Sequence, residues 1–71
     1  MSTKTFNDNN KRIINNIEES LQTIIQQKDI IVKLNRYEDA AKLRDIEKSL
    51  IEIQEKLKEF RLPAYLDVYN I

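Results

Sequence analysis

The apolar residues of the first half of the chain recur at the spacing of an α-helix. Five of them follow one another at steps of 3, 4, 3 and 7 residues: Ile14, Ile17, Leu21, Ile24 and Ile31. This spacing places them along one side of a helix, with Lys28 at the position that the last step skips. Further aliphatic residues widen the stripe: Ile13, Ile25, Ile30, Val32 and Leu34. The pattern predicts a long amphipathic helix whose apolar stripe is wider than one partner helix covers.

The second half has a more regular pattern. Its apolar residues are spaced by 3, 4, 3, 4 and 3: Leu43, Ile46, Leu50, Ile53, Leu57 and Phe60. This is the period of a coiled-coil helix. We expect one seam to join the helices to each other and to further hairpins, formed by Ile17, Leu21, Ile24, Ile46, Leu50, Ile53 and Leu57.

The connection between the two patterns predicts a hairpin. Asn35 suits a break, because Asn tolerates left-handed backbone, and it also suits an N-cap with Glu38 three residues later. The chain has no glycine and a single proline, Pro63, which ends the second helix. Two helices of similar length around a short turn pack antiparallel. We therefore predict an all-α fold: a flexible arm over 1–7, an antiparallel two-helix hairpin over 8–62 with its turn near 35–36, and an apolar tail over 63–71.

Length and composition exclude several classes of function. A chain of 71 residues supports one small domain of marginal stability. It contains no cysteine and no histidine, so the usual zinc and thiolate chemistry is absent and we expect no metal and no cofactor. Twelve basic residues balance twelve acidic ones, which makes direct nucleic-acid binding unfavourable. No run is long enough to span a bilayer and the N-terminus shows no hydrophobic signal, so we expect a cytoplasmic protein.

Nine residues around the predicted start of the second helix form a distinctive motif: Tyr37, Glu38, Asp39, Ala40, Ala41, Lys42, Leu43, Arg44 and Asp45. The small residues at 40 and 41 suit a close approach of two helices. From spacing alone, the motif is equally well explained as the way this hairpin turns, with its charged residues in solvent.

The motif resembles the UVR motif, named for the UvrB and UvrC repair proteins and also found in Clp-type unfoldase ATPases and their small partners. The resemblance covers about residues 28–55 and implies a helical hairpin that pairs with another hairpin. It implies that the tip and its packing are built by Tyr37, Ala40, Ala41 and Leu43. Directional polar contacts would come from Glu38, Arg44 and Asp45. Arg44 is the best candidate for a salt bridge to a partner, because its planar guanidinium binds carboxylates through two bonds.

The tail combines aromatic and apolar residues, with Tyr65, Leu66 and Tyr69 as its anchors. It is either disordered, folded back on the seam or docked on a partner, and the sequence does not decide between fold-back and docking.

Together these features predict a non-enzymatic interaction module, because a two-helix hairpin has no cleft to perturb a carboxylate pair and no histidine to activate a serine. We expect it to self-associate and to dock on a larger protein machine. One alternative is a small structural subunit of a large viral or cellular assembly. A weaker alternative is an accessory protein of a nucleic-acid repair complex, with a small basic arm of Lys4, Lys11 and Arg12.

Overall fold

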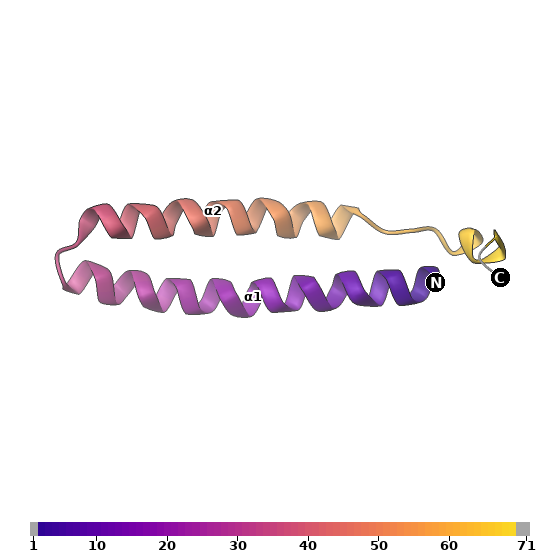
Figure 1. Cartoon of the computed structure of the whole chain (residues 1–71), viewed down its shortest axis with the longest axis horizontal. Helices are drawn as coiled ribbons and strands as arrows, with labels where there is room; N and C mark the ends of the chain where they lie inside the picture. Colours follow the sequence, from indigo (N-terminus) through magenta and orange to yellow (C-terminus); the bar gives the residue numbers. More distant parts are fainter. Residues whose placement is uncertain (1, 70–71) are drawn as a thin grey trace.

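A computed structural model describes residues 2–69 of the chain, with side chains as far as Leu66, and it is a helical hairpin. Helix α1 spans Thr3–Lys33, helix α2 spans Tyr37–Glu59, and a short 3-10 helix, η1, spans Ala64–Tyr69. The two long helices lie side by side in opposite directions, and η1 lies beyond the open end, near the start of α1 (Figure 1). The predicted antiparallel two-helix hairpin is confirmed.

The first helix begins earlier than the sequence indicated. The Ser2 hydroxyl caps it by accepting the Thr5 backbone N–H at 3.0 Å, as N-terminal caps do. The predicted arm over 1–7 is therefore helical from Thr3 onward. Near this end, the Phe6 ring lies against the Phe60 ring with centroids 5.3 Å apart, an aromatic contact that secures the first turns.

The turn is made by the left-handed backbone of Asn35, whose φ is 58°. Asn35 N–H donates to Val32 O at 2.9 Å and Arg36 N–H donates to Ile31 O at 3.1 Å. This pair of bonds closes the end of α1 in the manner of a Schellman motif, with Asn in the place usually taken by glycine. The alternative role of Asn35, as an N-cap paired with Glu38, is not adopted: the N-cap of α2 is Arg36, without a side-chain cap bond.

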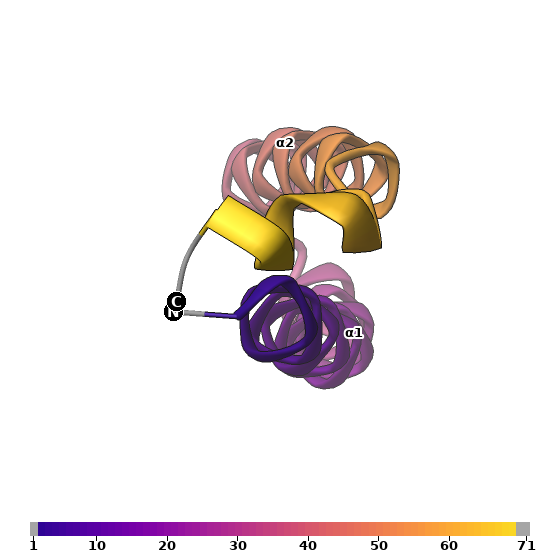
Figure 2. The same cartoon turned by 90° about the vertical axis from the view of Figure 1, so that its right-hand side faces the viewer.

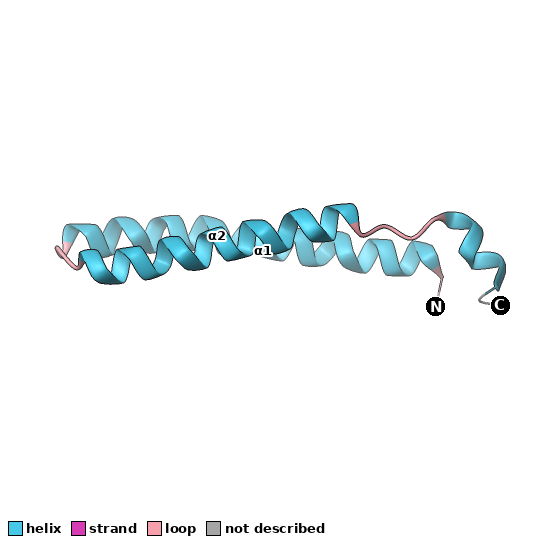
Figure 3. Cartoon of the chain, turned by 90° about the horizontal axis from the view of Figure 1, so that it is seen from above, coloured by secondary structure: helices cyan, strands magenta, loops and turns pink. Residues whose placement is uncertain are grey.

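The interface between the helices, here called the hairpin seam, follows one heptad row on each helix. On α1 its buried or half-buried members are Thr3, Asn7, Asn10, Ile14, Ile17, Leu21, Ile24, Lys28 and Ile31. On α2 they are Ala40, Leu43, Glu47, Leu50, Gln54 and Leu57. Figure 2 looks along the helices and Figure 3 from above, where the helices cross at a shallow angle, as coiled-coil packing requires.

The row predicted for α2 is wrong at three positions, of which Phe60 is 56% exposed and lies outside the hairpin seam. Ile46 and Ile53 are 49% and 48% exposed, while Glu47 and Gln54 take the seam. The reason is polar pairing across the seam. Lys28 Nζ lies 2.7 Å from Glu47 Oε2, and Gln54 Nε2 donates to Glu18 Oε2 at 3.0 Å and to the Ile14 carbonyl at 3.3 Å.

The hairpin is long and thin, and its core is small. It measures 57 × 15 × 12 Å. Among the described residues only Leu21 and Ala40 are buried apolar side chains, at 7% and 5% exposure, and no large side chain is fully buried. Neither long helix in residues 2–69 has an apolar stretch sufficient to cross a bilayer.

Candidate interaction site

The UVR-like motif forms the tip of the hairpin and divides into inner and outer residues. Ala40 is buried at 5% exposure and Leu43 is half-buried, so these two pack in the hairpin seam, as predicted for the packing of the tip. The other candidate residues are exposed: Tyr37, Glu38, Ala41, Arg44 and Asp45. Ala41 was predicted to pack with Ala40, but it faces solvent instead.

These five exposed residues share one side of α2. A helix turns by about 100° per residue, so positions separated by three, four or seven residues fall on one face. Tyr37, Ala41 and Arg44 satisfy this spacing, and Glu38 and Asp45 flank them. We call the five residues the docking stripe. It is one continuous strip of surface starting at the tip.

Arg44 is the functional group of the docking stripe that is free to bind. Within the described part of the chain its guanidinium has no ion-pair or hydrogen-bond partner, whereas Arg36 is held by Asp39 with Nε and Oδ2 2.6 Å apart. A second cation, Lys42, also approaches Asp39, at 3.8 Å. The local carboxylate therefore serves the turn and leaves Arg44 available for a carboxylate on another molecule.

Tyr37 presents a large apolar surface two helical turns before this cation, on the same side of α2. Its side chain is 64% exposed, and its hydroxyl donates to Asn35 Oδ1 at 3.1 Å. This bond holds the ring near the turn, where an open hollow of about 250 Å³ includes Tyr37 and Glu38 in its walls. Tyrosine and arginine are among the residue types that contribute most to binding at protein interfaces.

Aliphatic residues of α1 extend the docking stripe across the hairpin. In an antiparallel pair, residues that follow seam positions on each helix lie on the same flank. Val32 and Ile25 follow Ile31 and Ile24 just as Arg44 follows Leu43, and they are 45% and 44% exposed. The flank that carries Arg44 thus offers apolar area as well as charge.

The residues predicted to form the oligomer seam fall into two groups, one inside the hairpin seam and one outside it. Ile17, Leu21, Ile24, Leu50 and Leu57 lie in the hairpin seam, where they are buried or half-buried within one chain. Ile46 and Ile53 lie outside it. Each precedes a seam residue, so they fall on the flank opposite Arg44, which follows one.

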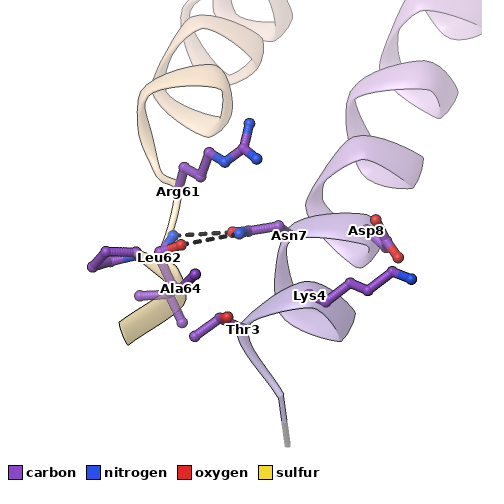
Figure 4. A pocket seen from close by; sticks show the side chains of 8 residues that line it. Thr3, Lys4, Asn7, Asp8, Arg61, Leu62 and Ala64 are labelled. Carbon is purple, nitrogen blue, oxygen red and sulfur yellow. Dashed lines mark hydrogen bonds between the residues drawn. The ribbon is translucent and has the colours of Figure 1, made fainter. Parts of the chain in front are cut away.

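At the open end, two asparagines that the sequence did not single out hold the chain beyond α2. Asn7 makes two bonds with Leu62: its Nδ2 donates to the carbonyl and its Oδ1 accepts the N–H, both at 3.0 Å (Figure 4). Asn10 Nδ2 donates to the Phe60 carbonyl at 3.0 Å. These side chains satisfy backbone groups that no longer have helical partners. The sequence contained one sign of this role. Asn7 and Asn10 fall in the row of α1 that faces the other half of the hairpin, where a side-chain amide needs a partner on the facing segment.

The tail folds back at least in part. Helix η1 packs against α1, and Leu66 is half-buried while Tyr65 is 66% exposed. The Tyr69 side chain lies outside the described residues. A shallow pocket of about 380 Å³ separates the tail from α1; Lys4, Asp8 and Arg61 are among its walls (Figure 4).

The basic arm inferred from the sequence is a helical surface. Lys4 and Lys11 share one row of α1, and Lys11 lines a second shallow pocket with Lys58 at the end of α2 and Arg61 just beyond it. Asp8 lines the same pocket, so the cations are partly balanced.

No protein-family model, no curated protein and no solved structure matches this chain.

Proposed function

We propose that this chain is a non-enzymatic interaction module, a UVR-like hairpin that self-associates and docks on a larger protein machine through the docking stripe. One observation carries the proposal: five exposed motif residues form one strip, with an unpaired arginine two helical turns from a tyrosine whose hydroxyl is hydrogen-bonded to the turn. The partner surface that fits this strip has a carboxylate for Arg44 and an apolar depression for Tyr37.

The resemblance to UVR and Clp-type proteins supports the same reading without naming the machine. Nothing in the hairpin supplies an ATPase, nuclease or zinc-binding segment, so what the resemblance lends is a mode of contact. In our proposal α2 supplies the specific contacts, and the short turn at Asn35 fixes the position of the docking stripe relative to α1.

An affinity pull-down from the native host tests the docking stripe. Tyr37→Ala/Arg44→Ala removes both anchors without touching the hairpin seam. The matched control is Arg61→Ala/Tyr65→Ala, which removes the same two residue types, both exposed, at the other end of the molecule. We expect the amount of partner recovered with the first variant to fall by about tenfold or more, and the amount recovered with the control to stay at the wild-type level.

Other outcomes have definite meanings. A partner lost only in the Arg61/Tyr65 variant would refute the docking stripe and assign docking to the tail. A whole particle retained by both variants, in fixed ratio with the chain, would favour the structural-subunit alternative, which the small core and large exposed surface also suit. Salt-sensitive nucleic acid recovered with the wild type and lost on removing Lys4 and Lys11 would favour the repair accessory.

A further inference from the structure

The flank of the hairpin opposite the docking stripe is free of charge along the whole of α1. On this flank, positions spaced alternately by three and four residues run from Phe6 through Ile13 to Leu34. Every one of them is aromatic, aliphatic, amide or hydroxyl, and every charged side chain of α1 lies on another row. A solvent-facing helix side of this length normally carries charges. The absence of charge from two adjoining rows indicates a surface that is covered.

Helix α2 completes the same surface. Residues that precede seam positions on each helix lie on one flank of an antiparallel pair, and the contact of Phe6 with Phe60 at 5.3 Å fixes this side by side arrangement at the open end. Between Phe60 and the tip, the same side of α2 carries Ile53 and Ile46, which are 48% and 49% exposed. We call this surface the neutral face: the α1 rows from Phe6 to Leu34 with Ile46, Ile53 and Phe60.

The exposed area of the hairpin shows how much surface is left to cover. A compact folded monomer of 8.5 kDa exposes about 4,700 Å², whereas this chain exposes 5901 Å². The excess is about 1,200 Å². A stable protein interface of standard size covers about 800 Å² on each partner. One interface of this size along the 57 Å hairpin would cover about two thirds of the excess.

We infer that the neutral face binds the neutral face of a second copy of this chain, giving a dimer of hairpins in which the uncharged α1 rows of both copies are covered. This assigns a surface to the self-association that forms part of the proposed function. A second copy is the occupant that fits. The rows on α1 offer no charge by which a different partner would be selected, and a chain with 12 basic and 12 acidic residues does not repel itself. On α2, Asp39, Lys42 and Lys56 also precede seam positions, and Lys42 Nζ lies 3.8 Å from Asp39 Oδ1; these are the charged side chains on the α2 half of this flank.

The geometry of a two-fold interface suits this surface. Such an interface uses the same patch on both copies, and the neutral face spans both helices and the length of the hairpin. Opposite it, the flank with Arg44 remains exposed. The dimer therefore presents two docking stripes, one on each outer side, and makes docking bivalent.

Sedimentation of the full chain tests the inference. The wild type at about 100 µM should sediment at twice 8.5 kDa. Ile46→Lys/Ile53→Lys should weaken the dimer by roughly a hundredfold or more, because two charged side chains replace two buried ones. The matched control, Ile25→Lys/Ile51→Lys, makes the same two changes on the opposite flank at 44% and 39% exposed positions, and it should remain dimeric. A monomeric wild type, or equal dissociation of both variants, would overturn the inference.

A labelling experiment keeps the test decisive if a lysine variant does not fold. The chain has no cysteine, so Ser20→Cys places a single thiol on the neutral face and Gln22→Cys places one on the other flank. Raising the protein concentration should slow maleimide labelling at position 20 several-fold and leave position 22 unchanged. Equal rates at both positions would contradict the assignment of the face.

The proposed dimer and the proposed docking stripe can be refuted independently of each other. Tyr37→Ala/Arg44→Ala leaves the neutral face intact and should not change the sedimented mass. A monomer that still loses its partner in that variant would refute the dimer alone, and a dimer whose partner binding ignores Tyr37 and Arg44 would refute the docking stripe alone.

Discussion

The ion pair inside the hairpin seam makes a prediction whose sign depends on whether one partner or both are replaced. Lys28 and Glu47 lie across from each other, with Nζ and Oε2 2.7 Å apart and side chains 27% and 22% exposed. Glu47 Oε2 is buried without a hydrogen bond of ordinary geometry, so within residues 2–69 the Lys28 ammonium is its one compensating charge.

Removing only the cation should destabilise the hairpin. Lys28→Met keeps the length and packing of the side chain and leaves the Glu47 carboxylate uncompensated. Fully buried pairs lose about 3–5 kcal/mol when broken in this way. Because both side chains here retain about a quarter of their exposure, we expect about 1–2 kcal/mol. For a domain of this length that lowers Tm by about 4–15 °C.

Replacing both partners should do the opposite. Lys28→Leu/Glu47→Leu removes the desolvated charges and adds apolar contacts in the hairpin seam, which stabilises by about 1–3 kcal/mol. Thermal unfolding followed by circular dichroism measures both variants at one fixed protein concentration, because the proposed dimer would make Tm concentration-dependent. If Lys28→Met left Tm unchanged, or if the double variant were less stable than the wild type, the assignment of this pair to the seam would be refuted.

Two further predictions concern the ends of the hairpin. Asn7→Ala should lower the free energy of unfolding by about 1–2 kcal/mol, because it removes both bonds to the Leu62 backbone, and denaturant titration should show no comparable loss for the exposed Asn15→Ala. Asn35→Ala should cost about 1 kcal/mol because Ala is disfavoured at a φ of 58°, whereas Asn35→Gly should be neutral or stabilising; equal losses in both variants would argue against a left-handed turn.

The first helix could be predicted from the sequence because its stripe is unambiguous. Ile14, Ile17, Leu21 and Ile24 occupy consecutive positions of one row, and even Lys28 follows from the skipped step. The turn at Asn35 was also predictable, because few residues other than glycine accept left-handed backbone. What hydrophobicity did not reveal was the start of α1, since a serine cap at Ser2 leaves no apolar signal.

The second helix shows why periodicity alone was insufficient. Two heptad rows share Leu43, Leu50 and Leu57, and they differ in whether Ile46 or Glu47 completes them. Apolar counting selects Ile46. The hairpin selects Glu47, because Lys28 on the facing helix supplies its counter-charge. That choice depends on a residue about 20 positions away and on the register of the turn, which a one-helix pattern does not contain.

The candidate site was predictable in its residues and less so in their roles. The motif located the tip, but spacing could not separate Ala40, which is buried, from Ala41, which is exposed. That distinction follows from which heptad row of α2 faces α1. The same choice of row moves Ile46 and Ile53 to the flank and creates the neutral face.

The two flanks of the hairpin are proposed to have separate roles, and one experiment tests this separation most directly. A tagged chain is expressed in the native host together with an untagged copy, in three forms: wild type, Tyr37→Ala/Arg44→Ala and Ile46→Lys/Ile53→Lys. Mass spectrometry then quantifies the untagged copy and the bound partner. We predict that the first variant loses the partner and keeps the copy, and that the second loses the copy and retains the partner at reduced yield. Variants that lose both together, or neither, would contradict the separation of the two flanks.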